Sequence, residues 1–163
     1  MRIVIDLDNT LVDELGATLR PGCKNFLTAL LQDGHELALW TSSSRNRAEE
    51  ILQRFNLHSF FSIVIYREDY QSLNKNARKD LRWLDADLII DDDPAEINFA
   101  KSTGKRGILI PPYRKDSEQN DRIMRSLNKS VKRAEPFRKL AVRKLDLLYR
   151  KPKQLKNRQS SKN

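Results

Sequence analysis

The sequence predicts an α/β fold built on a doubly wound parallel sheet, followed by a basic helical extension. Three observations lead to this prediction. Short apolar runs alternate along the chain with amphipathic stretches, Gly and Pro separate several of them, and the runs are apolar at consecutive positions. Strands of this kind are buried on both faces, as they are when crossover helices cover both sides of a parallel sheet.

The predicted elements follow one another as strand and helix. The strands are Arg2–Leu7, Glu36–Thr41, Ser62–Tyr66, Asp87–Asp91 and Arg106–Ile110. The helices are Pro21–Asp33, Arg45–Phe55, Lys75–Leu84 and Pro94–Thr103. Gly34 is expected to end the first helix. Asp93 is expected to cap the last one, which begins at Pro94 and ends at Gly104.

The chain changes character after Ile110–Tyr113. Residues 1–104 hold 12 Lys and Arg against 17 Asp and Glu, whereas residues 105–163 hold 19 against 5. We therefore divide the chain into a domain (1–114), a basic amphipathic helical extension (115–150) and a basic tail (151–163) with too little apolar content to fold. The extension has two interpretations: solvated helices packed on the domain, or a surface for nucleic acid or another polyanion.

The sequence also bears on the compartment. Cys23 is the only cysteine, so no internal disulfide forms and a reducing compartment is expected. A strand that begins at residue 2 leaves no room for a secretory signal, and no apolar run approaches the ~20 residues that span a membrane. We expect an intracellular protein, cytoplasmic or nuclear, that does not contact membranes. The sequence indicates no oligomeric state.

Polar side chains follow three of the predicted strands at their carboxyl ends, where ligands of parallel sheets bind. Asp6 and Asp8 end the first strand, Thr41 and Ser42 the second, and Asp91, Asp92 and Asp93 the fourth. Clustered carboxylates repel one another unless a cation lies among them, and ligands that are all oxygen favour Mg²⁺. One carboxylate can attack phosphorus, a second can transfer protons, and a hydroxyl and a lysine can hold the phosphoryl oxygens.

The string Asp6-Leu7-Asp8-Asn9-Thr10 resembles the first motif, DxDx[TV], of the haloacid dehalogenase superfamily. A finer resemblance is to phosphatases of the RNA polymerase II C-terminal-domain type, also called NLI-interacting-factor-like. It covers about residues 1–113 and rests on strings in matching order: DLDNTLV (6–12), RPG (20–22), LWTSSS (39–44), YREDY (66–70), KDL (79–81), LIIDDDP (88–94) and IPPY (110–113). The resemblance implies a Rossmann-like fold of the haloacid dehalogenase type.

The resemblance also implies a role for each matching residue. Asp6 is the expected nucleophile, Asp8 the general acid and base, and Thr41 a phosphate-binding hydroxyl, with Ser42 beside it. Asp6, the backbone carbonyl of Asp8, and Asp91 and Asp92 are the expected Mg²⁺ ligands. Asp93 replaces the family's usual serine, and we interpret it as a helix cap.

The phosphate-binding lysine has two candidates. The string KDL nominates Lys79, but Lys75 is nearer the family's spacing from Asp91. A five-residue strand rises ~16 Å, and the preceding helix needs ~11 residues to descend as far, which favours a helix that starts near Lys75. The sequence therefore favours Lys75 narrowly over Lys79.

The spacing of the motifs bears on the size of the substrate. The intervals between Asp8, Thr41 and Asp91 leave no room for a cap domain, so an open site and a large substrate are expected. The resemblance favours a phosphoprotein carrying phosphoserine or phosphothreonine, hydrolysed through an aspartyl-phosphate with Mg²⁺. One alternative is a polynucleotide end phosphatase, which the basic extension would suit. Another is a non-catalytic adaptor that binds nucleic acid with the same fold.

Overall fold

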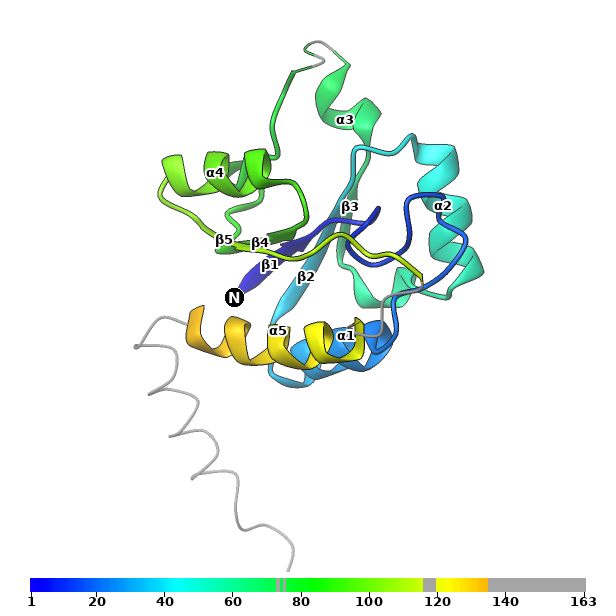
Figure 1. Cartoon of the computed structure of the whole chain (residues 1–163). Helices are drawn as coiled ribbons and strands as arrows, with labels where there is room; N and C mark the ends of the chain where they lie inside the picture. The colour runs from blue at the N-terminus through cyan, green and yellow to red at the C-terminus, as the bar shows by residue number, and fades with distance from the viewer. Residues whose placement is uncertain (73, 75, 116–119, 135–163) are drawn as a thin grey trace, which may run out of the picture.

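The computed structural model describes residues 1–72, 74, 76–115 and 120–134 (Figure 1). Its centre is a sheet of five parallel strands in the order β3-β2-β1-β4-β5. The strands are β1 (Arg2–Ile5), β2 (Glu36–Trp40), β3 (Ile63–Ile65), β4 (Leu88–Asp91) and β5 (Arg106–Leu109). The α/β class and the doubly wound parallel sheet predicted from the sequence are thus confirmed, with each strand slightly shorter than expected.

Helices connect the strands and cover the sheet. They are α1 (Cys23–Gln32), α2 (Arg45–Arg54), α3 (Arg67–Gln71), α4 (Pro94–Ser102) and α5 (Asn120–Ala134), with short 3-10 turns at His58–Phe60 and Leu81–Leu84. The first turn of α4 has the helix cap that the sequence predicts. Asp93 accepts a hydrogen bond from the Ala95 amide at 2.8 Å, and Pro94 is the first helical residue.

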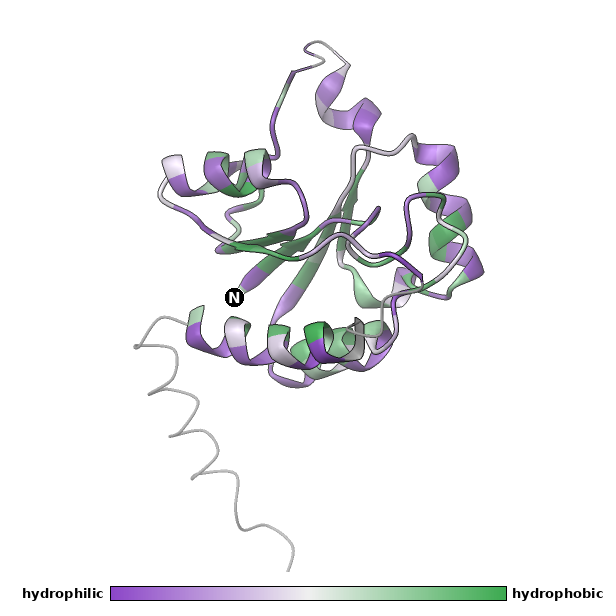
Figure 2. Cartoon of the chain, in the orientation of Figure 1, coloured by the Kyte–Doolittle hydropathy of each residue, from purple (hydrophilic) through white to green (hydrophobic). Residues whose placement is uncertain are grey.

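Successive residues of the central strand point into two different cores. Ile3 and Ile5 contribute to the larger core, with α1, α2 and α5 on that face of the sheet. Val4 contributes to the second core, which α4 covers from the other face. Figure 2 shows the resulting apolar centre, with hydrophilic residues on the outer sides of the helices. Burial on both faces explains why the strands are apolar at consecutive positions.

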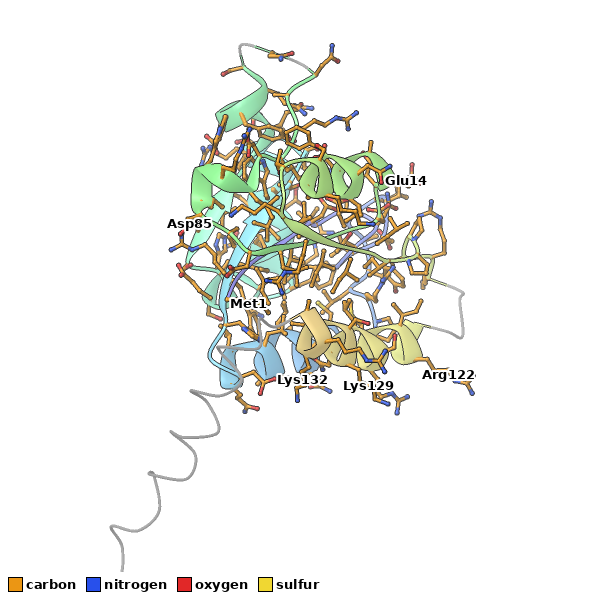
Figure 3. The ribbon with its side chains drawn as sticks, turned by 90° about the vertical axis from the view of Figure 1, so that its left-hand side faces the viewer. Met1, Glu14, Asp85, Arg122, Lys129 and Lys132 are labelled. Carbon is orange, nitrogen blue, oxygen red and sulfur yellow. The ribbon has the colours of Figure 1, made fainter. Side chains whose placement is uncertain are left out.

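Helix α5 packs beside α1 (Figure 1). Met124, Leu127 and Val131 recur on one helical face and are buried in the larger core. The basic side chains lie on the opposite face, and in Figure 3 Arg122, Lys129 and Lys132 project away from the sheet. The beginning of the expected extension therefore packs on the domain, whereas residues 135–163, with the rest of the extension and the tail, lie outside the described residues.

The helix predicted over Lys75–Leu84 is wrong. The described part of this segment is irregular until the turn at Leu81–Leu84, and the preceding helix is α3 instead. The reason is a tertiary contact: the backbone amide of Lys79 donates to Glu96 on α4 at 2.9 Å. An amide bonded in this way is not part of a helical ladder, and the Asp80 side chain then caps the 3-10 turn.

No helix among the described residues is long and apolar enough to cross a membrane.

Candidate active site

The candidate site lies at the carboxyl ends of β1, β2 and β4. The central strand β1 is flanked by β2 on one side and β4 on the other, so the chain connections diverge at this point of the sheet. Asp6 follows β1 directly, Thr41 follows β2, and Asp91 is the last residue of β4. This is the crevice in which open α/β sheets bind ligands.

Lys79 joins the two buried carboxylates of the site. Its ammonium nitrogen lies 2.6 Å from Oδ1 of Asp6 and 2.7 Å from Oδ2 of Asp91. All three residues are almost completely buried, and only 3% of the Lys79 side chain is exposed. Lys75, which the sequence favoured as the phosphate ligand, lies outside the described residues.

Burial and charge together set the protonation of this cluster. Burial raises the pKa of Asp6 to about 7; Asp91 and Asp92 raise it too, whereas Lys79 opposes the shift. Burial lowers the pKa of Lys79, but Asp6 and Asp91 outweigh burial and raise it overall, so this lysine stays charged. The pKa of Asp92 is raised by burial and by Asp91.

Three carboxylates form a candidate cation site. Oxygen atoms of Asp6, Asp91 and Asp92 lie within 4.8 Å of one another, and Asp92 also accepts a hydrogen bond from Thr10 at 3.3 Å. Lys79 donates to Asp6 and Asp91, and its single positive charge can offset the charge of one carboxylate at most. A hard divalent cation fits this donor set and this charge.

Asp8 lies beside the cluster in a different environment. Its Oδ1 accepts a hydrogen bond from Arg47 at 2.6 Å, and its Oδ2 accepts one from the Ser43 hydroxyl at 2.6 Å. Its side chain is 23% exposed, so it is more open to solvent than Asp6. The structure therefore separates the two aspartates of the motif into a buried one beside a lysine and a more exposed one beside an arginine.

The hydroxyls after β2 face different partners. Thr41 is fully buried; its Oγ1 accepts a hydrogen bond from the Ser43 amide at 3.0 Å and lies 3.5 Å from Oδ2 of Asp8. The Ser42 hydroxyl instead shares a hydrogen bond with the Tyr70 hydroxyl at 2.9 Å. Thr41 thus lies beside Asp8, whereas the Ser42 hydroxyl contacts Tyr70 on α3.

Sequence reasoning missed Arg47 and Ser43. Ser43 carries a weak signal, because it continues the run of hydroxyl residues after Thr41. Arg47 carries none, because arginine is common on an exposed helix and α2 has others at Arg45 and Arg54. Its contacts in the folded chain, with Asp8, Ser43 and the Glu14 carbonyl, distinguish it from the others.

Comparison with known proteins places the chain among phosphatases. The family model of NLI interacting factor-like phosphatases matches residues 1–143, which confirms the resemblance inferred from the motifs. The uncharacterized protein 037R of frog virus 3 is 31% identical over 101 residues, which cover 58% of this chain and 47% of that protein. The mitochondrial import inner membrane translocase subunit tim50 of Neurospora crassa is 29% identical over 108 residues, or 64% of this chain and 19% of that protein. The chain therefore aligns with less than half the length of either relative.

Solved structures show the same fold at low sequence identity. A putative β-phosphoglucomutase from Thermotoga maritima superposes with a TM-score of 0.61 at 15% identity, covering 78% of this chain and 98% of that one. A hydrolase of the haloacid dehalogenase superfamily from Geobacter sulfurreducens superposes with a TM-score of 0.56, also at 15% identity, covering 77% and 98%. These likenesses establish the Rossmann-like fold of this superfamily.

Proposed function

The chain belongs to the family of NLI interacting factor-like phosphatases, and from this premise we propose that it hydrolyses phosphomonoesters through an aspartyl-phosphate on Asp6. The observation that carries the proposal is the contact of Lys79 with both Asp6 and Asp91, at 2.6 and 2.7 Å, beside Asp92. Buried carboxylates around a lysine at the ends of parallel strands suit phosphoryl transfer, which depends on positioning and on charge stabilisation.

Each residue has a role in the two half-reactions. Asp6 attacks phosphorus, and the bond from phosphorus to the leaving oxygen breaks while Asp8 gives that oxygen a proton. In the second half-reaction Asp8 takes a proton from water, and the water oxygen displaces Asp6 from phosphorus. Lys79 and Thr41 hold the phosphoryl oxygens.

The cation completes the proposal. Asp6, Asp91 and Asp92, with the backbone carbonyl of Asp8, are the residues that would hold Mg²⁺. Bound there, the ion would offset the negative charge of the phosphoryl group.

We favour phosphoserine or phosphothreonine in a protein as the substrate. Among the described residues, the connections from β1 to β2 and from β2 to β4 contain only the elements of the domain itself, with no inserted cap. An uncapped site admits a peptide segment, and the NLI interacting factor-like family to which the chain belongs is a family of phosphatases. We propose the cytoplasm or the nucleus as its location.

One observation favours a second candidate, a polynucleotide end phosphatase. The outer face of α5 is basic and exposed through Arg122, Arg125, Lys129, Lys132 and Arg133. Such a face attracts a polyanion, and binding through it would weaken steeply with salt. A non-catalytic adaptor that binds nucleic acid would show the same binding but no turnover.

Phosphate release in Mg²⁺ distinguishes these candidates. The substrates are a phosphoserine peptide and a 3′-phosphorylated oligonucleotide, and the controls are EDTA and the Asp6→Asn variant. Turnover of the peptide supports the proposal. Turnover of the oligonucleotide alone supports the second candidate, and salt-sensitive binding without any turnover supports the adaptor.

A further inference from the structure

We propose that Arg47 is a positioning residue that fixes Asp8 for proton transfer to the leaving group. The inference rests on the proposed function, because it assigns Asp8 the role of general acid. It adds a residue from α2, which lies outside the motif of Asp6 and Asp8.

Both oxygens of the Asp8 carboxyl group have a partner. Arg47 donates to Oδ1 at 2.6 Å, and the Ser43 hydroxyl donates to Oδ2 at 2.6 Å. Arg47 also donates to the Ser43 hydroxyl. The arginine therefore holds one oxygen directly and the donor of the other as well, so it confines the carboxyl group to one orientation.

Arg47 is itself anchored at its far side. Its second terminal nitrogen donates to the backbone carbonyl of Glu14 at 2.9 Å. Glu14 belongs to the loop 13–18, which follows the aspartate motif. A planar guanidinium with several fixed donors can bind Asp8, Ser43 and this carbonyl at once, whereas a lysine ammonium lacks that fork.

The loop that receives Arg47 is internally braced. Asp13 accepts hydrogen bonds from the Ala17 amide, at 2.8 Å, and from the Thr18 hydroxyl. Its backbone amide donates to the Thr18 carbonyl at 3.1 Å. Arg54, at the end of α2, donates to the Gly16 carbonyl at 3.2 Å. The anchor of Arg47 is therefore a fixed part of the domain.

The contacts of Arg47 with Asp8 and Ser43 predict a specific kinetic consequence. General acid catalysis matters most when the leaving oxygen departs as a basic alkoxide, and little when it departs as a stable phenolate. A displaced Asp8 should therefore slow hydrolysis of a serine phosphate more than that of an activated aryl phosphate. A purely structural role for Arg47 would slow both substrates equally.

The experiment compares three variants on two substrates. The variants are Arg47→Ala, Arg47→Lys and the matched control Arg54→Ala, which removes a hydrogen bond to the same loop but none to Asp8. The substrates are a phosphoserine peptide and dinitrophenyl phosphate, with Mg²⁺, and the readout is kcat/KM, which reports the step that releases the leaving group.

We expect Arg47→Ala to lose roughly 100-fold on the peptide, the size expected for a misplaced catalytic group, and less than about fivefold on the aryl phosphate. Arg47→Lys should show the same substrate dependence with a smaller loss. Arg54→Ala should stay within about threefold of wild type on both substrates, because the other hydrogen bonds of the loop remain.

Equal losses on both substrates would overturn the inference while leaving the proposed function intact, and so would a peptide-selective loss of the same size in Arg54→Ala. If wild type hydrolysed neither substrate, the proposed function itself would fail. If circular dichroism shows that Arg47→Ala is unfolded, the Arg47→Lys variant alone decides. A selective loss of kcat/KM on the peptide supports the inference. Values of kcat/KM equal to those of wild type, or equal losses on both substrates, overturn it.

Discussion

Replacing Lys79 by methionine removes the cation between two buried carboxylates while keeping a side chain of similar length. The substitution breaks the hydrogen bonds of the ammonium group to Asp6, at 2.6 Å, and to Asp91, at 2.7 Å. The side chains of these aspartates are only 8% and 2% exposed, so water cannot replace the ammonium. Breaking a buried pair by removing one partner costs about 3–5 kcal/mol, because a buried charge is left without a counterion.

The assay is thermal and urea unfolding at pH 7.5 in EDTA, so that no divalent cation substitutes for the lysine. For a chain of 163 residues, a loss of about 3–5 kcal/mol corresponds to a fall in Tm of roughly 6–20 °C. The double variant Lys79→Met with Asp6→Asn should recover part of the loss, since one of the two uncompensated charges is gone.

A surface pair provides the control. Lys105 lies 3.8 Å from Asp85, whose side chain is 99% exposed. Lys105→Met should therefore cost less than about 1 kcal/mol. If Lys79→Met were as mild as Lys105→Met, or if adding Asp6→Asn lowered stability further, the explanation that Lys79 stabilises the buried carboxylates of Asp6 and Asp91 would be refuted. The rates of phosphate release by Lys79→Met and Lys75→Ala test which lysine binds phosphate. We expect a large loss of activity only for Lys79→Met.

Three further predictions concern Asp6, Asp8 and the packing of α5. Asp6→Asn should abolish phosphate release while leaving the circular dichroism spectrum unchanged, and any turnover by this variant would contradict the role of Asp6 as nucleophile. Asp8→Asn should slow both half-reactions by ~10²–10⁴-fold in stopped-flow and steady-state assays. In EDTA, the stability contributed by Asp6 should be complete below pH ~4 and lost as the pH rises through about 7, because the pKa of Asp6 is higher in the folded chain than in the unfolded one. In urea unfolding from pH 4 to 8, the free energy of unfolding should therefore change less with pH for Asp6→Asn than for wild type. Leu127→Ala should cost about 2–5 kcal/mol, since this side chain is buried between α5 and the domain, whereas exposed Lys129→Ala should change stability by less than about 0.5 kcal/mol in the same assay.

The succession of strands along the chain and the strand-end chemistry were accessible from the sequence because both depend on local patterns. An apolar run with carboxylates at its end identifies β1 with Asp6 and β4 with Asp91, and parallel topology then brings these ends together. The family match and the solved structures confirm the fold. The roles of Asp6 and Asp8 stay predictions that the mutants above test, and the role of Thr41 stays a prediction.

The segment before β4 was not accessible because a distant residue determines its conformation. Ala77, Leu81 and Leu84 recur at helical spacing, yet the Lys79 amide bonds to Glu96, 17 residues further along the chain. That contact positions the lysine between Asp6 and Asp91. Arg47 was inaccessible for a similar reason, since its partners Asp8 and Glu14 lie more than 30 residues earlier in the chain.

The central place of β1 in the sheet has a consequence for how the chain folds as it is synthesised. Ile5 pairs with Leu39 on one side and with Ile90 on the other. The first strand to be made is thus enclosed only after the fourth has appeared, and such long-range pairing is slow because a large loop must close. The contacts of Lys79 with Asp6 and Asp91 depend on the same closure. Catalytic competence should therefore appear late in folding, and a nascent chain that ends before residue 91 should lack it altogether.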